Sequence, residues 1–100
     1  MTVSIVTRWS SPDAQKSTEL AKKAKAIWIK NGALDVRLNQ VHTGPFTGQY
    51  IFVTVFPDMA TYAKALAATS SSGDIQKIVA ANTKLGAVLL ERGILIGVDL

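Results

Sequence analysis

The sequence predicts an α+β domain in which a four-stranded antiparallel sheet carries its helices on one face. Three observations lead to this prediction: a strongly apolar strand at residues 49–56, amphipathic helical stretches before and after it, and the order in which strands and helices follow one another. The chain has 100 residues, so we expect a single domain covering residues 1–100.

Residues 49–56 read Gln-Tyr-Ile-Phe-Val-Thr-Val-Phe, a run of aromatic and β-branched side chains with the length of one strand. Side chains alternate across a strand, so each face of this one is apolar. We therefore expect it to be central in its sheet and covered on both sides. The two sets that share a face are Tyr50, Phe52 and Phe56 on one side, and Ile51, Val53 and Val55 on the other.

The segment before it predicts a strand followed by a helix. Residues 3–9 alternate as a strand, and Ser11-Pro12-Asp13 is typical of a helix start, with a Ser cap and Pro at the first helical position. Apolar residues then recur at helical spacing, and Asn31-Gly32 predicts the helix end. In the strand, Val3, Ile5 and Trp9 share one face, and Ser4, Val6 and Arg8 share the other.

Residues 34–42 predict a second strand that forms a hairpin with residues 49–56. Val36 and Leu38 are expected to face the core, and Arg37 and Asn39 to face away from it. The connection, residues 43–48, is rich in Gly and Pro and predicts a long hairpin loop.

The last third of the chain predicts more helix and a closing strand. Asp58 is expected to cap one helix, residues 69–73 to interrupt it, and Asp74 to cap a further helical piece. The sequence allows that piece to end at Gly86 or at Gly93. We favour Gly86, because apolar residues then share one face of a last strand: Val88, Leu90, Ile94, Ile96 and Val98.

The predicted order is strand, helix, strand, strand, helix, strand, which is the split βαβ arrangement of a ferredoxin-like sandwich. Right-handed crossovers put the helices on the same side of the sheet and leave its other face bare. An apolar bare face marks a partner or ligand surface. We expect two such sheets to close into an α/β barrel, which makes the chain a homodimer. The aromatic set Tyr50, Phe52 and Phe56 is our first choice for the interface.

The chain resembles the dimeric α/β-barrel superfamily, which includes antibiotic-biosynthesis monooxygenase-like and NIPSNAP-like proteins. The resemblance covers nearly the whole chain and rests on patterns that lead into each element: Asn31-Gly32-Ala33, Gly44 to Gly48, Phe56-Pro57-Asp58 and the apolar closing strand. It implies a ferredoxin-like protomer, a homodimer and often a cleft between sheet and helices. Its members include cofactor-independent oxygenases, haem-degrading enzymes and dehydratases, and the fold does not choose among these.

Composition restricts the function further. The chain has no cysteine and one histidine, so we expect neither a disulfide nor a metal site, and no cofactor. The net charge of +4 comes largely from lysines of one helical stretch, which we interpret as a solvated face. Residues 1–20 lack the pattern of a signal peptide, and no apolar run has the length of a membrane helix, so we expect a cytoplasmic protein.

The candidate functional residues are polar or aromatic side chains of the predicted strands. His42 is the one candidate for proton transfer, although a solvated histidine beside a Gly-Pro turn is its simpler interpretation. The candidates for ligand binding are Trp9, Arg37, Asn39, His42 and Tyr50. We assign Trp28 and Tyr62 to the core, because both lie on the apolar stripes of their helices.

Two functions of different class fit these features. The first is a homodimer that binds a small organic molecule in an aromatic cleft, with a cofactor-independent monooxygenase-like reaction as the enzymatic form. The second is a non-enzymatic dimer without a ligand. An RNA-recognition module has the same element order, and Gly48 to Val53 is similar to its third-strand motif. Thr47 in place of a basic residue, Thr54 in place of an aromatic one, and Ser4 in the first strand argue against nucleic acid.

Overall fold

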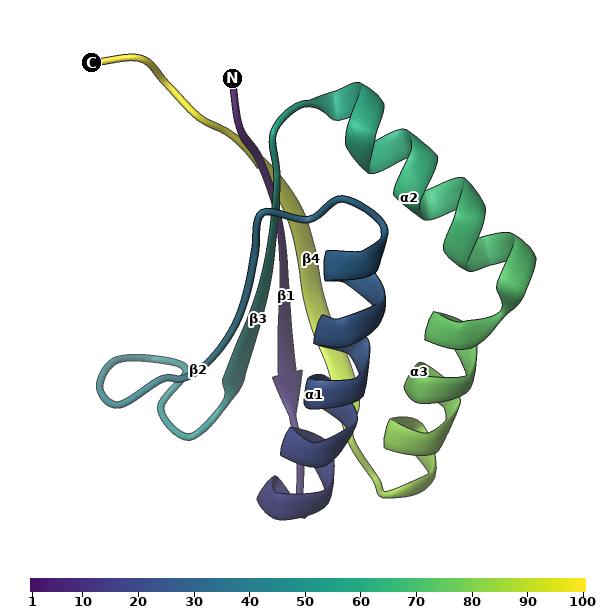
Figure 1. The fold of residues 1–100 in the computed structure, drawn as a ribbon. Helices are drawn as coiled ribbons and strands as arrows, with labels where there is room; N and C mark the ends of the chain where they lie inside the picture. Colours follow the sequence, from purple (N-terminus) through teal and green to yellow (C-terminus); the bar gives the residue numbers. More distant parts are fainter.

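The structure is a computed structural model that describes all residues from Met1 to Leu100. It contains four strands and three helices in the predicted order, and the predicted interruption after residue 69 divides the second helical segment into two helices (Figure 1). The strands are β1 (Val3–Ser10), β2 (Asp35–Gln40), β3 (Tyr50–Phe56) and β4 (Val88–Ile96), and the helices are α1 (Ala14–Lys30), α2 (Met59–Ser72) and α3 (Asp74–Lys84).

The strands form one antiparallel sheet in the order β2-β3-β1-β4, as the ferredoxin-like prediction requires. β1 and β3 are central, and Val6 of β1 pairs with Val53 of β3. Residues that pair across an antiparallel ladder point to the same side of the sheet. The register therefore places Val3, Ile5, Thr54 and Phe56 on one face of the sheet.

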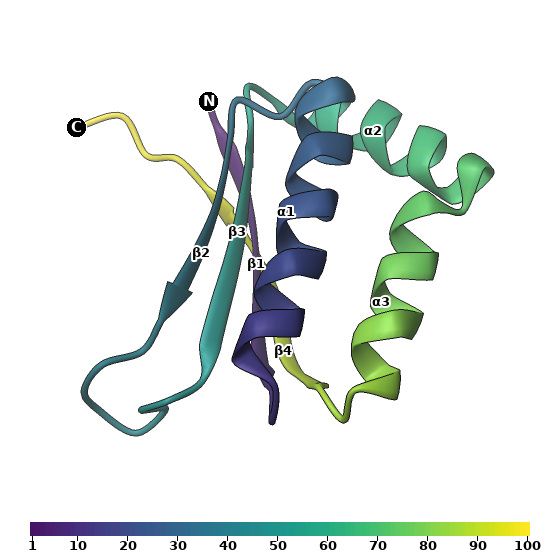
Figure 2. The ribbon, with the colours of Figure 1, turned by 60° about the horizontal axis from the view of Figure 1, so that its bottom comes forward.

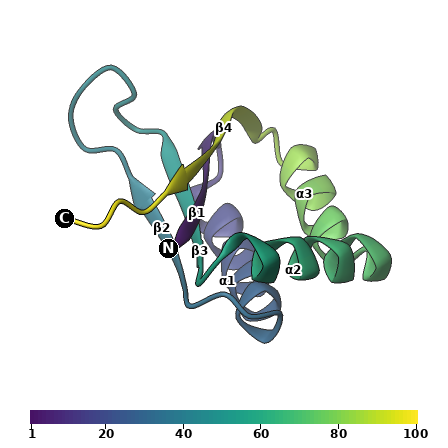
Figure 3. The same cartoon turned by 90° about the horizontal axis from the view of Figure 1, so that it is seen from above.

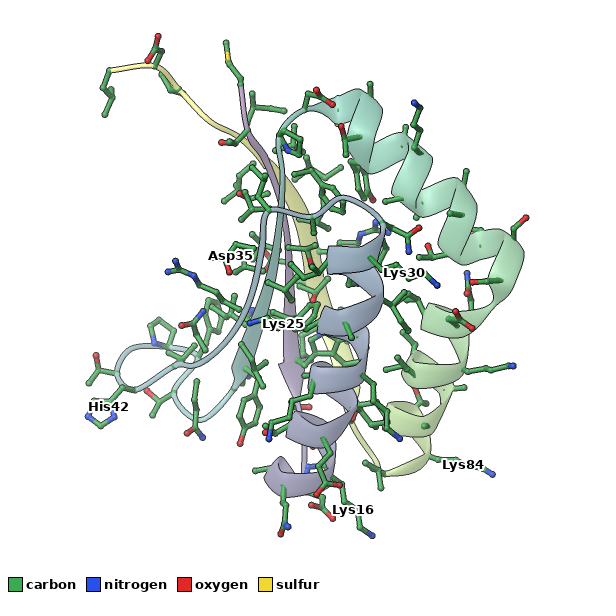
Figure 4. All side chains as sticks on the ribbon, in the orientation of Figure 1. Lys16, Lys25, Lys30, Asp35, His42 and Lys84 are labelled. Atoms are coloured by element: carbon green, nitrogen blue, oxygen red, sulfur yellow. The ribbon has the colours of Figure 1, made fainter.

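All three helices lie on one side of this sheet, which confirms the predicted layering (Figures 2 and 3). α1 runs along the sheet, and α3 lies against α1. The lysines of α1 are exposed. In Figure 4, Lys16 lies at the N-terminal end of α1, whereas Lys25 extends toward the side of β2, on which Asp35 lies. None of the three helices combines the length and the apolarity that crossing a bilayer requires.

The core lies between the sheet and the ends of α1 and α2. Phe56 is completely buried, and its ring meets Trp28 edge-on with the centroids 6.0 Å apart. Tyr62 packs against the same ring at 5.4 Å. This confirms the assignment of Trp28 and Tyr62 to the core. The small buried residues Ala33 and Ala65 complete the cluster around Val3, Ile5 and Val36.

The burial of Phe56 corrects the predicted assignment of the two sheet faces. Tyr50, Phe52 and Phe56 point toward the helices, so this aromatic set does not form the bare face. The bare face of β3 carries the aliphatic set Ile51, Val53 and Val55, which is half-buried by neighbouring strands. The sequence left this choice open because both sets are apolar, and only packing of the helices decides it.

Two helix starts follow local hydrogen bonding. Asp58 caps α2 as predicted, and its carboxylate accepts a hydrogen bond of 2.7 Å from the backbone N–H of Thr61. The cap of α1 is Asp13, which accepts from the N–H of Lys16, and not Ser11. The prediction that Asp74 caps α3 is wrong: Asp74 is the first residue of the helix, and the cap is Gly73, whose φ of +74° is a conformation that favours glycine.

The helix α3 ends at Lys84 and the last strand begins at Val88, two residues after Gly86, as expected from an end of the helical piece at that glycine. A β-bulge at Leu90 shifts the register, because Arg8 pairs with Glu91 and Trp9 pairs with Leu89. Leu89 and Ile94 therefore share the helix side of the sheet, whereas Val88 lies on the other side. The prediction that Val88, Leu90, Ile94, Ile96 and Val98 share one face of the strand is wrong for this reason. Ile94 and Ile96 do share a face, but Val88 lies on the other one, and Val98 follows the end of β4.

The cap of α2 yields a pH-dependent prediction. The backbone N–H and the hydroxyl of Thr61 stabilise the ionised carboxylate and lower the pKa of Asp58 below its usual value of 3.8. A lowered pKa in the folded state stabilises the fold above the unfolded value, and this contribution disappears as the pH falls through the folded one. Asp58→Ala should lower the Tm at pH 7, and the difference from the wild type should shrink as the pH falls below 3.8. Thermal unfolding followed by circular dichroism at pH 7 and at a series of acidic pH values measures this.

Asp58→Asn is the matched control, because its amide oxygen can still accept from Thr61 without carrying a charge. Its Tm should lie between those of the wild type and Asp58→Ala at pH 7. A Tm difference between the wild type and Asp58→Ala that does not change with pH would contradict the capping role.

Candidate functional site

A cavity of about 270 Å³ lies between the sheet and helices α1 and α3. It forms because the part of α1 that faces this region of the sheet presents the small residues Ala21 and Ala24. α3 then covers the space from the other side with Ile75, Ile78 and Val79. Of the 24 residues that line the cavity, 16 are hydrophobic, so it is suited to an organic molecule.

Aromatic rings make up much of the wall. Tyr50 and Phe52 contribute from β3, and Trp9 contributes from β1. The indole N–H of Trp9 donates to the hydroxyl of Thr7 at 2.9 Å, which fixes the orientation of the ring. The aromatic residues that line the cavity are Trp9, Trp28, Tyr50, Phe52, Phe56 and Tyr62.

Arg92 of β4 is the charged residue of the cavity, and no carboxylate lines it. Its guanidinium donates to the hydroxyl of Tyr62, with Nη2 2.5 Å from the oxygen. No acidic side chain neutralises it, since the salt bridges of the molecule involve Arg8 and Arg37 instead. A cation beside an apolar chamber favours a ligand with an anionic or strongly accepting oxygen.

The structure separates the five predicted ligand-binding residues into two groups. Trp9 and Tyr50 line the cavity. Arg37 and Asn39 lie on the opposite face of the sheet, where both are exposed. His42 lies in the exposed loop between β2 and β3, and Figure 4 shows it far from the helices. His42, Arg37 and Asn39 therefore do not share a pocket with Trp9 and Tyr50.

The polar residues of the outer face are engaged with one another. Arg37 donates to Asp35 at 2.6 Å, and this hydrogen bond lowers the pKa of the Asp35 carboxyl. Arg8 forms a 3.1 Å ion pair with Glu91, and its guanidinium stacks over the ring of Phe46 at 3.8 Å. The contacts of Arg8 join the hairpin loop and β4 to β1.

The polar residues that the structure brings to the cavity are not among the candidates predicted from the sequence. Arg92 could have been found, because it is spaced by two residues from Ile94 and therefore shares a strand face with Ile94 and Ile96. It is a lone cation on this otherwise apolar face. Ser17 and Asn82 gave no such signal, since their side chains meet only when α1 and α3 pack together. The structure contains no group of three or more His, Cys, Asp or Glu side chains arranged to hold a metal ion.

Comparison with solved structures supports the fold. The chain is similar to SnoaB, a cofactor-independent oxygenase from Streptomyces nogalater, with a TM-score of 0.76 at 18% identity over 99% of this chain and 95% of that one. A NIPSNAP family protein from Agrobacterium tumefaciens has a TM-score of 0.69 at 14% identity, covering 99% of this chain and 95% of its own. A dimeric ferredoxin-like protein from an uncultured marine organism has a TM-score of 0.68 at 14% identity, with 98% of each chain covered.

The resemblance predicted from the sequence is confirmed at the level of the fold: the chain has the ferredoxin-like architecture of these proteins. No protein-family model and no curated protein sequence matches the chain. Identities of 14–18% establish a shared architecture, whereas the function has to be argued from the cavity itself.

The cavity can be tested directly by filling it. Ala21→Phe should occupy the space that Ala21 leaves beside the aromatic wall. We expect the affinity for the apolar anionic dye 1-anilinonaphthalene-8-sulfonate to fall at least about tenfold, without a loss of Tm. Fluorescence titration and thermal unfolding measure the two effects. Ala80→Phe, on the exposed side of α3, is the control and should bind the dye as the wild type does. Equal dye binding by both variants would show that the dye does not use the cavity.

Proposed function

We propose that the protein is a homodimer that binds a flat, hydrophobic organic acid in the cavity between its sheet and helices. The observation that carries the proposal is the unneutralised guanidinium of Arg92 beside an aromatic chamber. Flat apolar rings suit the walls built by Trp9, Tyr50 and Phe52. The acidic oxygen of the ligand binds Arg92, and Tyr62 orients that guanidinium.

The same arrangement supports an oxygenase-like reaction. The likeness to SnoaB, a cofactor-independent oxygenase, favours this class. An oxygenase without a cofactor must take electrons from its substrate, so the substrate has to be an electron-rich compound that reacts as an anion. Arg92 and Tyr62 would stabilise the negative charge on a substrate oxygen beside the apolar wall of the cavity.

The arrangement gives no support to RNA recognition. Base stacking in modules of this element order uses aromatic residues on the open face of the sheet. Here Tyr50 and Phe52 face the helices, and the open face of β3 carries Ile51 and Val53. A small molecule therefore fits the aromatic residues better than a nucleic acid does.

The open sheet face supports the homodimer. Its centre is apolar and consists of Val6, Ile51, Val53 and Val55 on the two central strands, with Leu95 beside them on β4. Polar and charged residues surround this centre: Asp35, Arg37 and Asn39 on edge strand β2, Glu91 on edge strand β4, and Ser4 and Arg8 toward the two ends of β1. An apolar centre within a polar rim is the usual composition of a protein–protein interface.

The strand β4 adds to this surface. It is exposed along its whole length, and more than half of the surface of Val88 and Leu95, which lie on the open face, is accessible to solvent. The C-terminal residues that follow run away from the helices and leave β4 uncovered (Figures 1 and 2). A partner sheet would remove this apolar surface from water, at about 25 cal/mol per Å².

Binding of an organic acid is tested with fluorene-2-carboxylate, a flat anionic probe, by isothermal titration calorimetry. Hydrogen bonds to charged groups contribute about 1.5–3 kcal/mol, so Arg92→Gln should weaken binding at least about tenfold. The neutral alcohol 9H-fluorene-2-methanol is the matched control, and its affinity should change little in the same variant. Equal affinity of the wild type and Arg92→Gln for the acid would reject the role of Arg92.

The interface is tested with Val53→Asp, which puts a carboxylate in the apolar centre of the open face. We expect the variant to be a folded monomer at micromolar concentration where the wild type is a dimer, because burying an unpaired charge opposes association. Light scattering coupled to size-exclusion chromatography measures the mass. Asn39→Asp, on the polar rim, should remain dimeric. A monomeric wild type, or a dimeric Val53→Asp, would contradict the proposed interface.

A further inference from the structure

A chain of three hydrogen-bonded side chains joins α1 to α3 at one part of the cavity wall. The hydroxyls of Ser11 and Ser17 lie 2.6 Å apart, and the hydroxyl of Ser17 donates to Oδ1 of Asn82 at 2.7 Å. Ser11 in turn accepts from the backbone N–H of Asp13 at 3.2 Å. Ser11, Ser17 and Asn82 all line the cavity.

The distances show which group is the donor in each of these hydrogen bonds. Ser11 has two possible acceptors, and the contact to Ser17 at 2.6 Å is much better than the one to the carbonyl of Asp13 at 3.3 Å. Ser11 therefore donates to Ser17, and Ser17 donates its own proton to Asn82. The 2.7 Å separation from Asn82 fits an O–H···O bond, because N–H···O bonds are usually about 2.9–3.0 Å long.

This direction fixes the Asn82 amide with its oxygen toward Ser17. Its Nδ2 group then carries two N–H donors that are accessible to solvent and donate to no protein atom, since the structure contains no buried polar atom without a partner. Asn82 is half-buried in a wall that is otherwise largely apolar. The N-terminal turn of α1, which includes Ser17, adds a positive dipole end on the same side. Both features favour an acceptor oxygen on a bound molecule.

We propose that the Nδ2 of Asn82 is a specificity-determining donor that selects ligands with a carbonyl oxygen in addition to their acidic group. This deepens the proposed function and rests on it: the ligand is a flat aromatic keto acid, whose acid binds Arg92 and whose carbonyl accepts from Asn82. Ser17 is a positioning residue, because it acts by holding the amide in its orientation.

The test uses two probes that differ by one carbonyl: 9-fluorenone-2-carboxylate and fluorene-2-carboxylate. Isothermal titration calorimetry gives the ratio of the two Kd values, in which the shared contribution of the carboxylate cancels. A site built to donate a hydrogen bond discriminates against an analogue without the acceptor. We expect the wild type to prefer the ketone by about five- to tenfold, the effect of one net hydrogen bond.

Four variants distinguish the loss of the hydrogen-bond donor of Asn82 from a change in packing. Asn82→Leu removes the donor at similar volume and should bring the ratio close to one. Asn82→Asp keeps the acceptor for Ser17 and loses the donor, so it should give the same ratio even if the leucine variant folds poorly. Ser17→Ala should give an intermediate ratio, because the donor remains but is no longer held. Thr83→Leu, an exposed neighbour in the same helix, should leave the wild-type ratio unchanged.

The outcomes distinguish this inference from the function on which it rests. Equal affinity of the wild type for the two acids would overturn the role of Asn82 and leave the acid-binding cavity intact. Preference for the ketone that persists in both Asn82 variants would also overturn it. Failure of the wild type to bind either acid would reject the proposed function, and the specificity of Asn82 with it.

Discussion

The packing of Phe56 against two aromatic residues of different helices determines how the rest of the structure is arranged. Its ring meets Trp28 of α1 edge-on and Tyr62 of α2 at a tilt of 51°, and it has no exposed surface. These contacts fix α1 and α2 to the end of β3. Because side chains alternate along a strand, fixing Phe56 inward also turns Thr54, Phe52 and Tyr50 inward. A register shift of one residue would exchange this lining for Ile51, Val53 and Val55.

The cavity follows from the way in which the helices diverge from that anchor. Near Phe56, large aromatic groups fill the space between sheet and helices. Farther along β1 and β3, the residues of α1 that line the cavity include the small Ala21 and Ala24, and α3 packs on α1 and α2 without reaching the sheet closely. The same sheet therefore has a dense core at one end and a chamber at the other. The polar atoms of the chamber are held by neighbours, such as Thr7 under Trp9 and Tyr62 against Arg92.

The sequence was sufficient for features that depend on local pattern. The alternation of Val3 to Trp9, the loop before Tyr50, the cap at Asp58 and the stop at Gly86 each have a short-range cause, and each was predicted. The two apolar faces of β3 are equivalent by pattern, so only the position of the helices could choose between them. The bulge at Leu90 likewise depends on pairing with Arg8 and Trp9 and changes which residues of β4 share a face.

The candidate site was less accessible to prediction than the fold, and the reason is distance along the chain. Trp9 and Tyr50 could be selected, because an aromatic residue on a strand is visible in the sequence by itself. The bond from Ser17 to Asn82 joins residues that are 65 positions apart, and the one from Arg92 to Tyr62 joins residues 30 apart. No local pattern relates such residues. Arginine at position 37 and histidine at position 42 appeared more promising than Arg92 only because their elements were easier to recognise.

The low burial of helix α3 affects the local opening of the molecule. None of its residues is fully buried, and glycines with positive φ, Gly73 and Gly86, adjoin its two ends. A segment with so little buried surface opens at a lower free energy than the sheet does. The amide protons of α3 should therefore exchange with solvent long before those of β1 and β3. A molecule bound in the cavity would contact α3 and restrain this local opening. Binding should therefore slow amide exchange first in the eleven residues of α3, which form one wall of the cavity.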